Sequence, residues 1–126
     1  GNFAKRIEKI KVNLVSFLKK QVGRGKKIFI YGASTRGQVV LQYAGINDKL
    51  IQAATDKNSD KWGKYIVGTG IPIIPLAEYR KRNPDYLFVL PYQFINEIKK
   101  QEKEYLENGG KMVVVIPKLK IIDKNS

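Results

Sequence analysis

The sequence predicts an α/β fold in three layers, with a mostly parallel sheet of about five strands and helices on both faces. Short apolar runs alternate with segments of helical periodicity along the chain, which is typical of such sheets. A glycine-containing turn, 32–37, separates the first apolar run from the next helical segment. The run Tyr86 to Leu90 is continuously apolar, as in a strand covered on both faces.

An amphipathic helix is predicted at the N-terminus, over residues 2–22. Its apolar side chains recur every three or four residues and form one stripe: Phe3, Ile7, Ile10, Leu14, Leu18 and Val22. The basic residues beside the stripe would suit a helix on a membrane surface. We favour a helix that packs its stripe on the domain or links it to a preceding one. The predicted division is a linker or packing helix, 1–24, and a Rossmann-like domain, 25–126.

The remaining elements follow from apolar runs, glycines and prolines. Helices are predicted at 35–44, 76–82 and 94–108, and a polar loop at 57–70. The segment "IPIIP" from Ile71 is a brief strand between prolines, so we expect it at an edge of the sheet. The other strands are expected at 27–31, 50–55, 86–90 and 112–116, with a short further strand at 119–122 as an option.

Composition excludes several kinds of chemistry. The 126 residues contain neither cysteine nor histidine, which excludes disulfides, the usual zinc sites and Ser-His or Cys-His catalytic pairs. The absence of cysteine fits a cytoplasmic protein, and no apolar run approaches the length of a membrane span. The chain begins at Gly1 and its one methionine is Met112, which indicates a piece of a longer protein.

The net charge of +13 favours an anionic partner such as a nucleotide. A lysine-rich solvated surface is the simpler interpretation. The basic residues are scattered along the chain and do not alternate with aromatic residues, so we do not expect nucleic acid as the partner.

The turn Gly32-Ala33-Ser34-Thr35-Arg36-Gly37 resembles three known phosphate or catalytic loops to different degrees. A nucleophile elbow would need glycine where Arg36 stands, and a Walker A loop would need Lys after Gly37. The dinucleotide fingerprint G-x-G-x-x-G matches at Gly32 and Gly37, but its middle glycine is Ser34. We therefore expect a Rossmann-like turn that can hold an anion but suits NAD poorly. The alternative is that the two glycines serve only strand–helix packing.

The chain resembles the C-terminal domain of S-adenosylmethionine-dependent sugar C-methyltransferases over about residues 27 to 117. The likeness lies in an ordered series of short motifs along the chain. The motifs are the turn 32–37, Asp56-Lys57-Asn58, Lys61-Trp62-Gly63, Gly68-Thr69-Gly70-Ile71-Pro72-Ile73, Pro84-Asp85-Tyr86, Leu90-Pro91-Tyr92, Glu97-Ile98 and Gly109-Gly110.

This resemblance implies a three-part parent enzyme: a zinc domain, a methyltransferase domain that binds S-adenosylmethionine, and this domain. The nucleotide-linked keto-deoxysugar would lie between the last two, so its partners are that sugar and the methyltransferase domain of the same chain. The family's Tyr-x-Glu-His catalytic stretch has no counterpart here. We therefore expect no catalytic residue and no cofactor in this piece, with S-adenosylmethionine and zinc in the other domains.

Substrate-binding residues are expected beyond the carboxyl ends of the parallel strands, where ligands bind in such sheets. Arg36 would pair with phosphate or sugar oxygens, and Tyr92 would stack on a base or sugar. Asp56, 24 residues after Gly32, suits a ribose-binding acid, although it could instead cap a turn, and Tyr92 could be rim packing. Lys61 and Trp62 are expected to stabilise the loop. The full set is Gly32, Ser34, Thr35, Arg36, Gly37, Asp56, Asn58, Pro91 and Tyr92.

Two other functions stay open at this point. One is a nucleotide-sugar binding module of another enzyme, such as a sugar-nucleotide acyltransferase, although no hexapeptide repeat begins in the chain. The other is a basic nucleic-acid binder, which only the net charge suggests.

Overall fold

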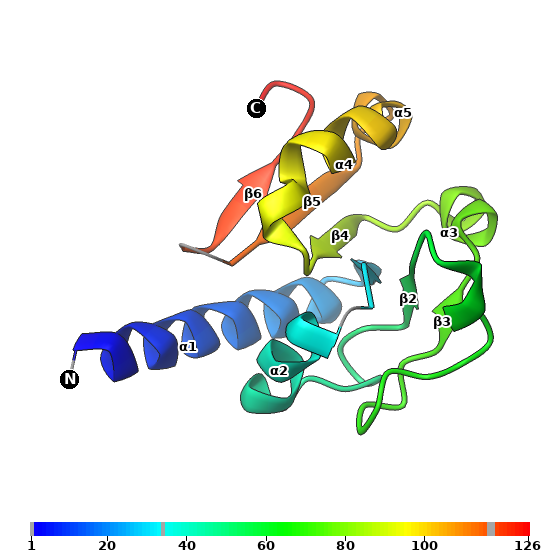
Figure 1. Cartoon of the computed structure of the whole chain (residues 1–126). Helices are drawn as coiled ribbons and strands as arrows, with labels where there is room; N and C mark the ends of the chain where they lie inside the picture. The colour runs from blue at the N-terminus through cyan, green and yellow to red at the C-terminus, as the bar shows by residue number, and fades with distance from the viewer. Residues whose placement is uncertain (1, 34, 116–117) are drawn as a thin grey trace.

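A six-stranded sheet forms the centre of the molecule, as seen in a computed structural model that describes residues 2–33, 35–115 and 118–126 (Figure 1). The strand order is β3-β2-β1-β4-β5-β6, with β1 to β5 parallel and β6 antiparallel. The α/β prediction is confirmed, and the optional strand at the C-terminus is present as β6. The strands are β1 (Ile28–Tyr31), β2 (Ala53–Thr55), β3 (Ile73–Ile74), β4 (Tyr86–Val89), β5 (Lys111–Val114) and β6 (Lys120–Ile122).

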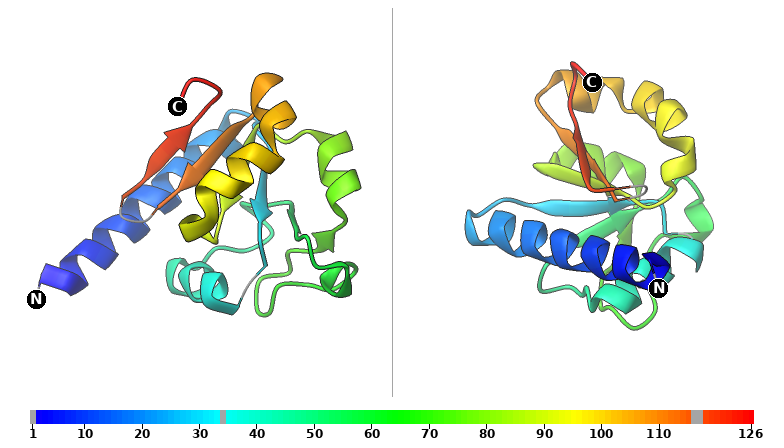
Figure 2. Two further views of the ribbon diagram at one scale, coloured as in Figure 1. Left: turned by 45° about the horizontal axis from the view of Figure 1, so that its top comes forward. Right: turned by 90° about the vertical axis from the view of Figure 1, so that its left-hand side faces the viewer.

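Helices cover both faces of this sheet (Figure 2). One face carries α1 (Asn2–Gly23) and α2 (Thr35–Ala44). The other carries α3 (Leu76–Arg82), α4 (Ile95–Gln101) and α5 (Lys103–Glu107). Two short 3-10 helices, η1 (Ser59–Lys61) and η2 (Tyr92–Phe94), follow β2 and β4.

The sheet has one hydrophobic core on each face. The central strands β1 and β4 are apolar throughout because each contributes side chains to both cores. In β1, Ile28 and Ile30 join the core under α1 and α2, whereas Phe29 and Tyr31 join the core under α3 to α5. Successive strand residues point to opposite faces, so a strand covered on both sides shows no polar alternation. As predicted, the strand between prolines, β3, lies at an edge of the sheet.

The N-terminal helix packs on the sheet through its C-terminal half. Leu14 and Leu18 are fully buried, and the ring of Phe17 meets that of Tyr86 edge-on, with centroids 5.2 Å apart. Its first turns extend beyond the sheet (Figure 1). Of the helices that the structure describes, none is long and apolar enough to cross a membrane.

The helix predicted over 94–108 is wrong in one respect, because it is divided into η2, α4 and α5. The break falls at Glu102, whose backbone has φ −106° and ψ 30°. Its side chain is buried and accepts hydrogen bonds from Tyr79 Oη (2.8 Å) and from Arg80 Nε (3.2 Å) and Nη2 (2.7 Å). These partners lie 22 and 23 residues earlier in the chain, so helical periodicity alone cannot reveal the break.

Arg80→Ala tests how much the buried ion pair stabilises the fold. It leaves the Glu102 carboxylate buried without its cation, and because Arg80 is itself half-exposed we expect a loss of about 1–3 kcal/mol in the free energy of unfolding. Urea denaturation followed by circular dichroism measures this. Lys103→Ala, which breaks the exposed Lys103–Glu107 pair, is the control and should cost about 0.5 kcal/mol or less. Equal losses in the two variants would contradict the prediction.

Candidate functional site

A cavity of about 330 Å³ lies at the carboxyl ends of β1, β2 and β4. The chain builds the sheet outward from β1 in both directions, so β1 and β4 flank the topological switch point where ligands bind in open α/β sheets. We call this space the switch-point cavity. Three of its lining residues follow directly after strands: Gly32 after β1, Asp56 after β2 and Pro91 shortly after β4.

Gly32 is required by the close approach of the chain after β4. Its N–H donates to the carbonyl of Thr55 (2.9 Å), and its φ is +89°, which disfavours other residues. A Cβ at this position would lie 2.6 Å from Cδ of Pro91. The fingerprint glycine therefore packs against Pro91, which brings the ends of β1 and β4 together.

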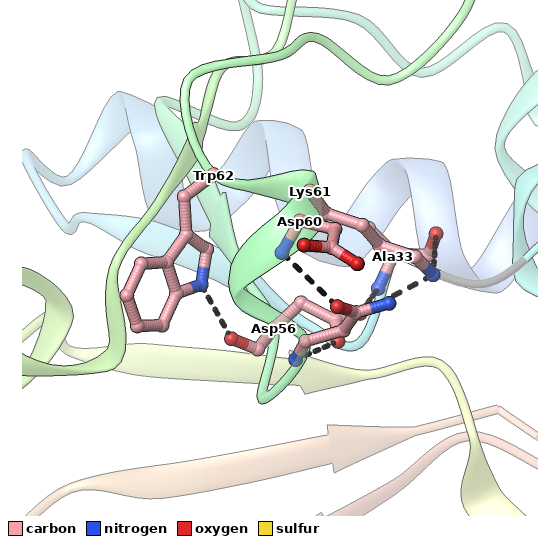
Figure 3. Close-up of polar contacts among 6 residues, drawn as sticks. Ala33, Asp56, Asp60, Lys61 and Trp62 are labelled. Atoms are coloured by element: carbon pink, nitrogen blue, oxygen red, sulfur yellow. Dashed lines mark hydrogen bonds and ion pairs between the residues drawn. The ribbon is translucent and has the colours of Figure 1, made fainter.

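The Asp56 carboxylate joins the loops after β1 and β2 (Figure 3). Oδ2 accepts from the Ala33 N–H (2.7 Å), and Oδ1 accepts from the Asn58 N–H (2.8 Å). Lys61 Nζ lies 3.6 Å from Oδ2 and donates to the Ala33 carbonyl (3.0 Å). Of the two interpretations of Asp56, these contacts support the turn-capping acid, because both carboxylate oxygens already bind the protein's own backbone.

Further side chains hold the loop after β2 in shape. Trp62 Nε1 donates to the Asp56 carbonyl (2.7 Å), as Figure 3 shows. Asn58 Oδ1 accepts from the Asp60 N–H (3.0 Å) and so caps η1. Lys61 and Trp62 thus bond within these loops, in line with the stabilising role that we expected for them.

One wall of the switch-point cavity was not predicted from the sequence. Phe94, Glu97, Ile98 and Gln101 line it from η2 and α4. Their spacing of three and four residues places them on one helical face, which is the signal that could have revealed them. Tyr31 also lines the cavity, together with Lys57 and Lys61, and its hydroxyl donates to Gln101 Oε1 (3.3 Å).

The predicted binding residues are therefore only partly brought together. Gly32, Asp56 and Pro91 share the cavity, whereas Asn58 and Tyr92 are not among the described residues that line it. Ser34 lies outside the described residues, as do the side chains of Thr35 and Arg36. Gly37 is placed by its backbone in the first turn of α2.

Tyr31 is a neutral hydrogen-bonding group at this site. Burial raises the pKa of its hydroxyl from 10.0 to about 12, and the negative charge of Glu102 adds to this rise. Burial likewise raises the pKa of Tyr79 and Tyr105, whose rings belong to the same core. All three hydroxyls stay protonated at neutral pH, so none can act there as a base.

Comparison with known proteins places this chain beside methyltransferases. Residues 1–117 match a family described as the C-methyltransferase C-terminal domain. The C-methyltransferase NovU of Streptomyces niveus is 34% identical over 124 residues, which are 98% of this chain and 30% of NovU. The chain therefore spans less than a third of the length of this relative.

Gly32→Ala tests the contact between the turn and Pro91. We expect the free energy of unfolding to fall by about 2–4 kcal/mol for two reasons. The new methyl group clashes with the Pro91 ring, and alanine is strained at the positive φ of this position. Gly109→Ala is the matched control: its φ is also positive, +96°, but a Cβ there meets no neighbour, so only about 1 kcal/mol should be lost. Urea denaturation of both variants measures the two losses in the free energy of unfolding. Equal losses would mean that the contact with Pro91 does not contribute to the cost of Gly32→Ala.

Alkaline pH should destabilise the fold through its buried tyrosines. The unfolded chain releases the Tyr31 proton near pH 10, whereas the folded chain holds it until about pH 12, so the free energy of unfolding should fall as the pH rises between these values. Tyr31→Phe should reduce this fall, because it removes the hydroxyl whose pKa is raised in the folded chain. Urea denaturation at several pH values measures the slope, and the same slope in Tyr31→Phe as in the wild type would overturn the prediction.

Proposed function

Because the chain belongs to the family of C-methyltransferase C-terminal domains, we propose that it binds the nucleotide-linked sugar on which a C-methyltransferase acts. The chain would hold this substrate and would not catalyse the transfer by itself. The family membership favours this function over the acyltransferase module that the sequence had left open. The substrate would be a keto-deoxysugar carried on a nucleoside diphosphate.

The observation that carries the proposal is the switch-point cavity with its cations. Lys57 and Lys61 line it on the side of the loop after β2. Lys61 is held in place by the Ala33 carbonyl and by Asp56, and its side chain is 35% exposed. Because Lys61 is paired with Asp56, the exposed ammonium group of Lys57 is the main local attraction for a diphosphate, and the net charge of +13 supports its approach.

The other lining residues suit the less charged parts of such a ligand. Pro91 and the half-exposed Phe94 offer apolar surface on which a sugar or base can stack. The volume of about 330 Å³ lies at the lower end of the range of small-molecule sites. This fits a domain that supplies one side of a site, with the methyltransferase domain of the same chain supplying the other.

The methyl transfer itself would take place on that other domain. S-adenosylmethionine, when bound there, supplies the methyl group, and zinc would belong to a further domain. Without cysteine or histidine this chain offers zinc neither the thiolate nor the imidazole ligands from which structural zinc sites are built. What this chain contributes is binding, through Lys57 and Lys61, and a fixed orientation of the sugar. We propose a cytoplasmic location, with which the absence of cysteine is compatible.

Titration of the chain with a thymidine-diphosphate-linked hexose, followed by amide chemical shifts in NMR, tests the proposal. We expect shifts at Gly32, Lys57 and Lys61, and Lys57→Ala should weaken binding by about three- to tenfold through the loss of one cation.

Lys19→Ala removes an exposed cation from α1, on the other face of the sheet, and should leave the affinity unchanged. Shifts confined to residues outside the switch-point cavity, or none at millimolar ligand, would refute the proposal. Tighter binding of an oligonucleotide, weakening steeply with salt, would favour the nucleic-acid hypothesis instead.

A further inference from the structure

The acid expected to hydrogen-bond a ligand, Asp56, is bonded to the protein's own backbone in this structure. In dinucleotide-binding sheets an acid after the second strand accepts from a sugar hydroxyl. Here Asp56 has that position, but its two carboxylate oxygens accept from the Ala33 and Asn58 N–H groups. Each oxygen of the Asp56 carboxylate thus already accepts one backbone hydrogen bond that holds the loops, and only 14% of its side chain is exposed to a ligand.

A second carboxylate lines the same cavity from a different element, α4. Glu97 lies in the first turn of α4, and its side chain is exposed. Among the side-chain hydrogen bonds and ion pairs between described residues, none involves the Glu97 carboxylate. The α4 face that carries Glu97 also carries Gln101, whose amide can both donate and accept hydrogen bonds.

The charges are therefore divided across the switch-point cavity. Lys57 and Lys61 come from the loop after β2, and Glu97 and Gln101 come from α4. Lys61 offsets the charge of Asp56, with which it pairs, so a diphosphate is attracted to Lys57 and repelled by Glu97 and should rest on the β2 side. The uncharged, hydroxyl-bearing part of the ligand is then left to the α4 side, where a carboxylate accepts strongly from O–H groups.

We propose that Glu97 is the specificity-determining residue that accepts hydrogen bonds from hydroxyls of the hexose, a role separate from the ribose-binding role that the sequence suggested for Asp56. This rests on the proposed function, because it needs a nucleotide-linked sugar in the switch-point cavity. Glu97 selects the sugar, and the lysines bind the diphosphate.

The test compares two ligands on two variants of the chain. NMR titrations with thymidine diphosphate and with a thymidine-diphosphate-linked hexose are made on wild type, Glu97→Gln and Glu78→Gln. For Glu97→Gln we expect the hexose-linked ligand to bind about tenfold more weakly, because a charged hydrogen-bond acceptor is lost. Thymidine diphosphate should bind equally well or more tightly, because a repelling charge is gone. Glu78→Gln makes the same change in charge on exposed α3 and should alter neither ligand.

Each other outcome separates the two proposals. If wild type binds the hexose-linked ligand and Glu97→Gln binds it equally well, Glu97 has no such role, although the proposed function stands. If Glu97→Gln weakens both ligands by the same factor, Glu97 contacts the nucleotide rather than the hexose, and the assignment is wrong. If wild type binds neither ligand, the proposed function itself fails, and with it the role of Glu97. Thermal unfolding of both variants confirms that each is folded.

Discussion

The bonds of the Asp56 carboxylate fix the edge of the sheet on which the candidate site depends. Backbone N–H groups at Ala33 and Asn58 belong to different loops, and a single side chain satisfies both. Lys61 closes the arrangement by donating to the Ala33 carbonyl. Bonds of this kind involve charged groups and are about twice as strong as neutral ones. The contact of Gly32 with Pro91 adds the end of β4, so three neighbouring strand ends form one rim.

The opposite wall of the cavity is positioned by a separate set of contacts. The α4 helix ends where Glu102 turns into the protein and bonds to Tyr79 and Arg80 of α3. Gln101, the residue before Glu102, accepts a hydrogen bond from the Tyr31 hydroxyl at the end of β1. Because a buried carboxylate is costly unless it is paired, Tyr79 and Arg80 stabilise Glu102 at the break between α4 and α5. The wall that carries Glu97 is thus bonded to α3 and β1.

The net positive charge can be related to a particular kind of ligand only through the charged residues of the switch-point cavity. A net charge of +13 favours any anionic partner, from a nucleotide to a nucleic acid. At the switch-point cavity, however, the cations Lys57 and Lys61 share the lining with two carboxylates, Asp56 from the loop after β2 and Glu97 from α4. A site of mixed charge suits a ligand that is anionic at one end and hydroxylated at the other, in agreement with the sugar substrate proposed for this methyltransferase family member.

The sequence by itself determined the α/β class, the edge position of β3 and the turn after β1, because these follow from local patterns. Apolar periodicity, flanking prolines and the glycine turn act over a few residues and are visible in any short window. Tertiary structure alone decided that Asp56 bonds to Ala33, that Glu102 breaks a helix and that Glu97 faces the site. Each of these depends on groups that folding brings together, either from 22 or more residues away in the chain or from a different element. A local sequence pattern extends over only a few residues, so it cannot predict such a contact.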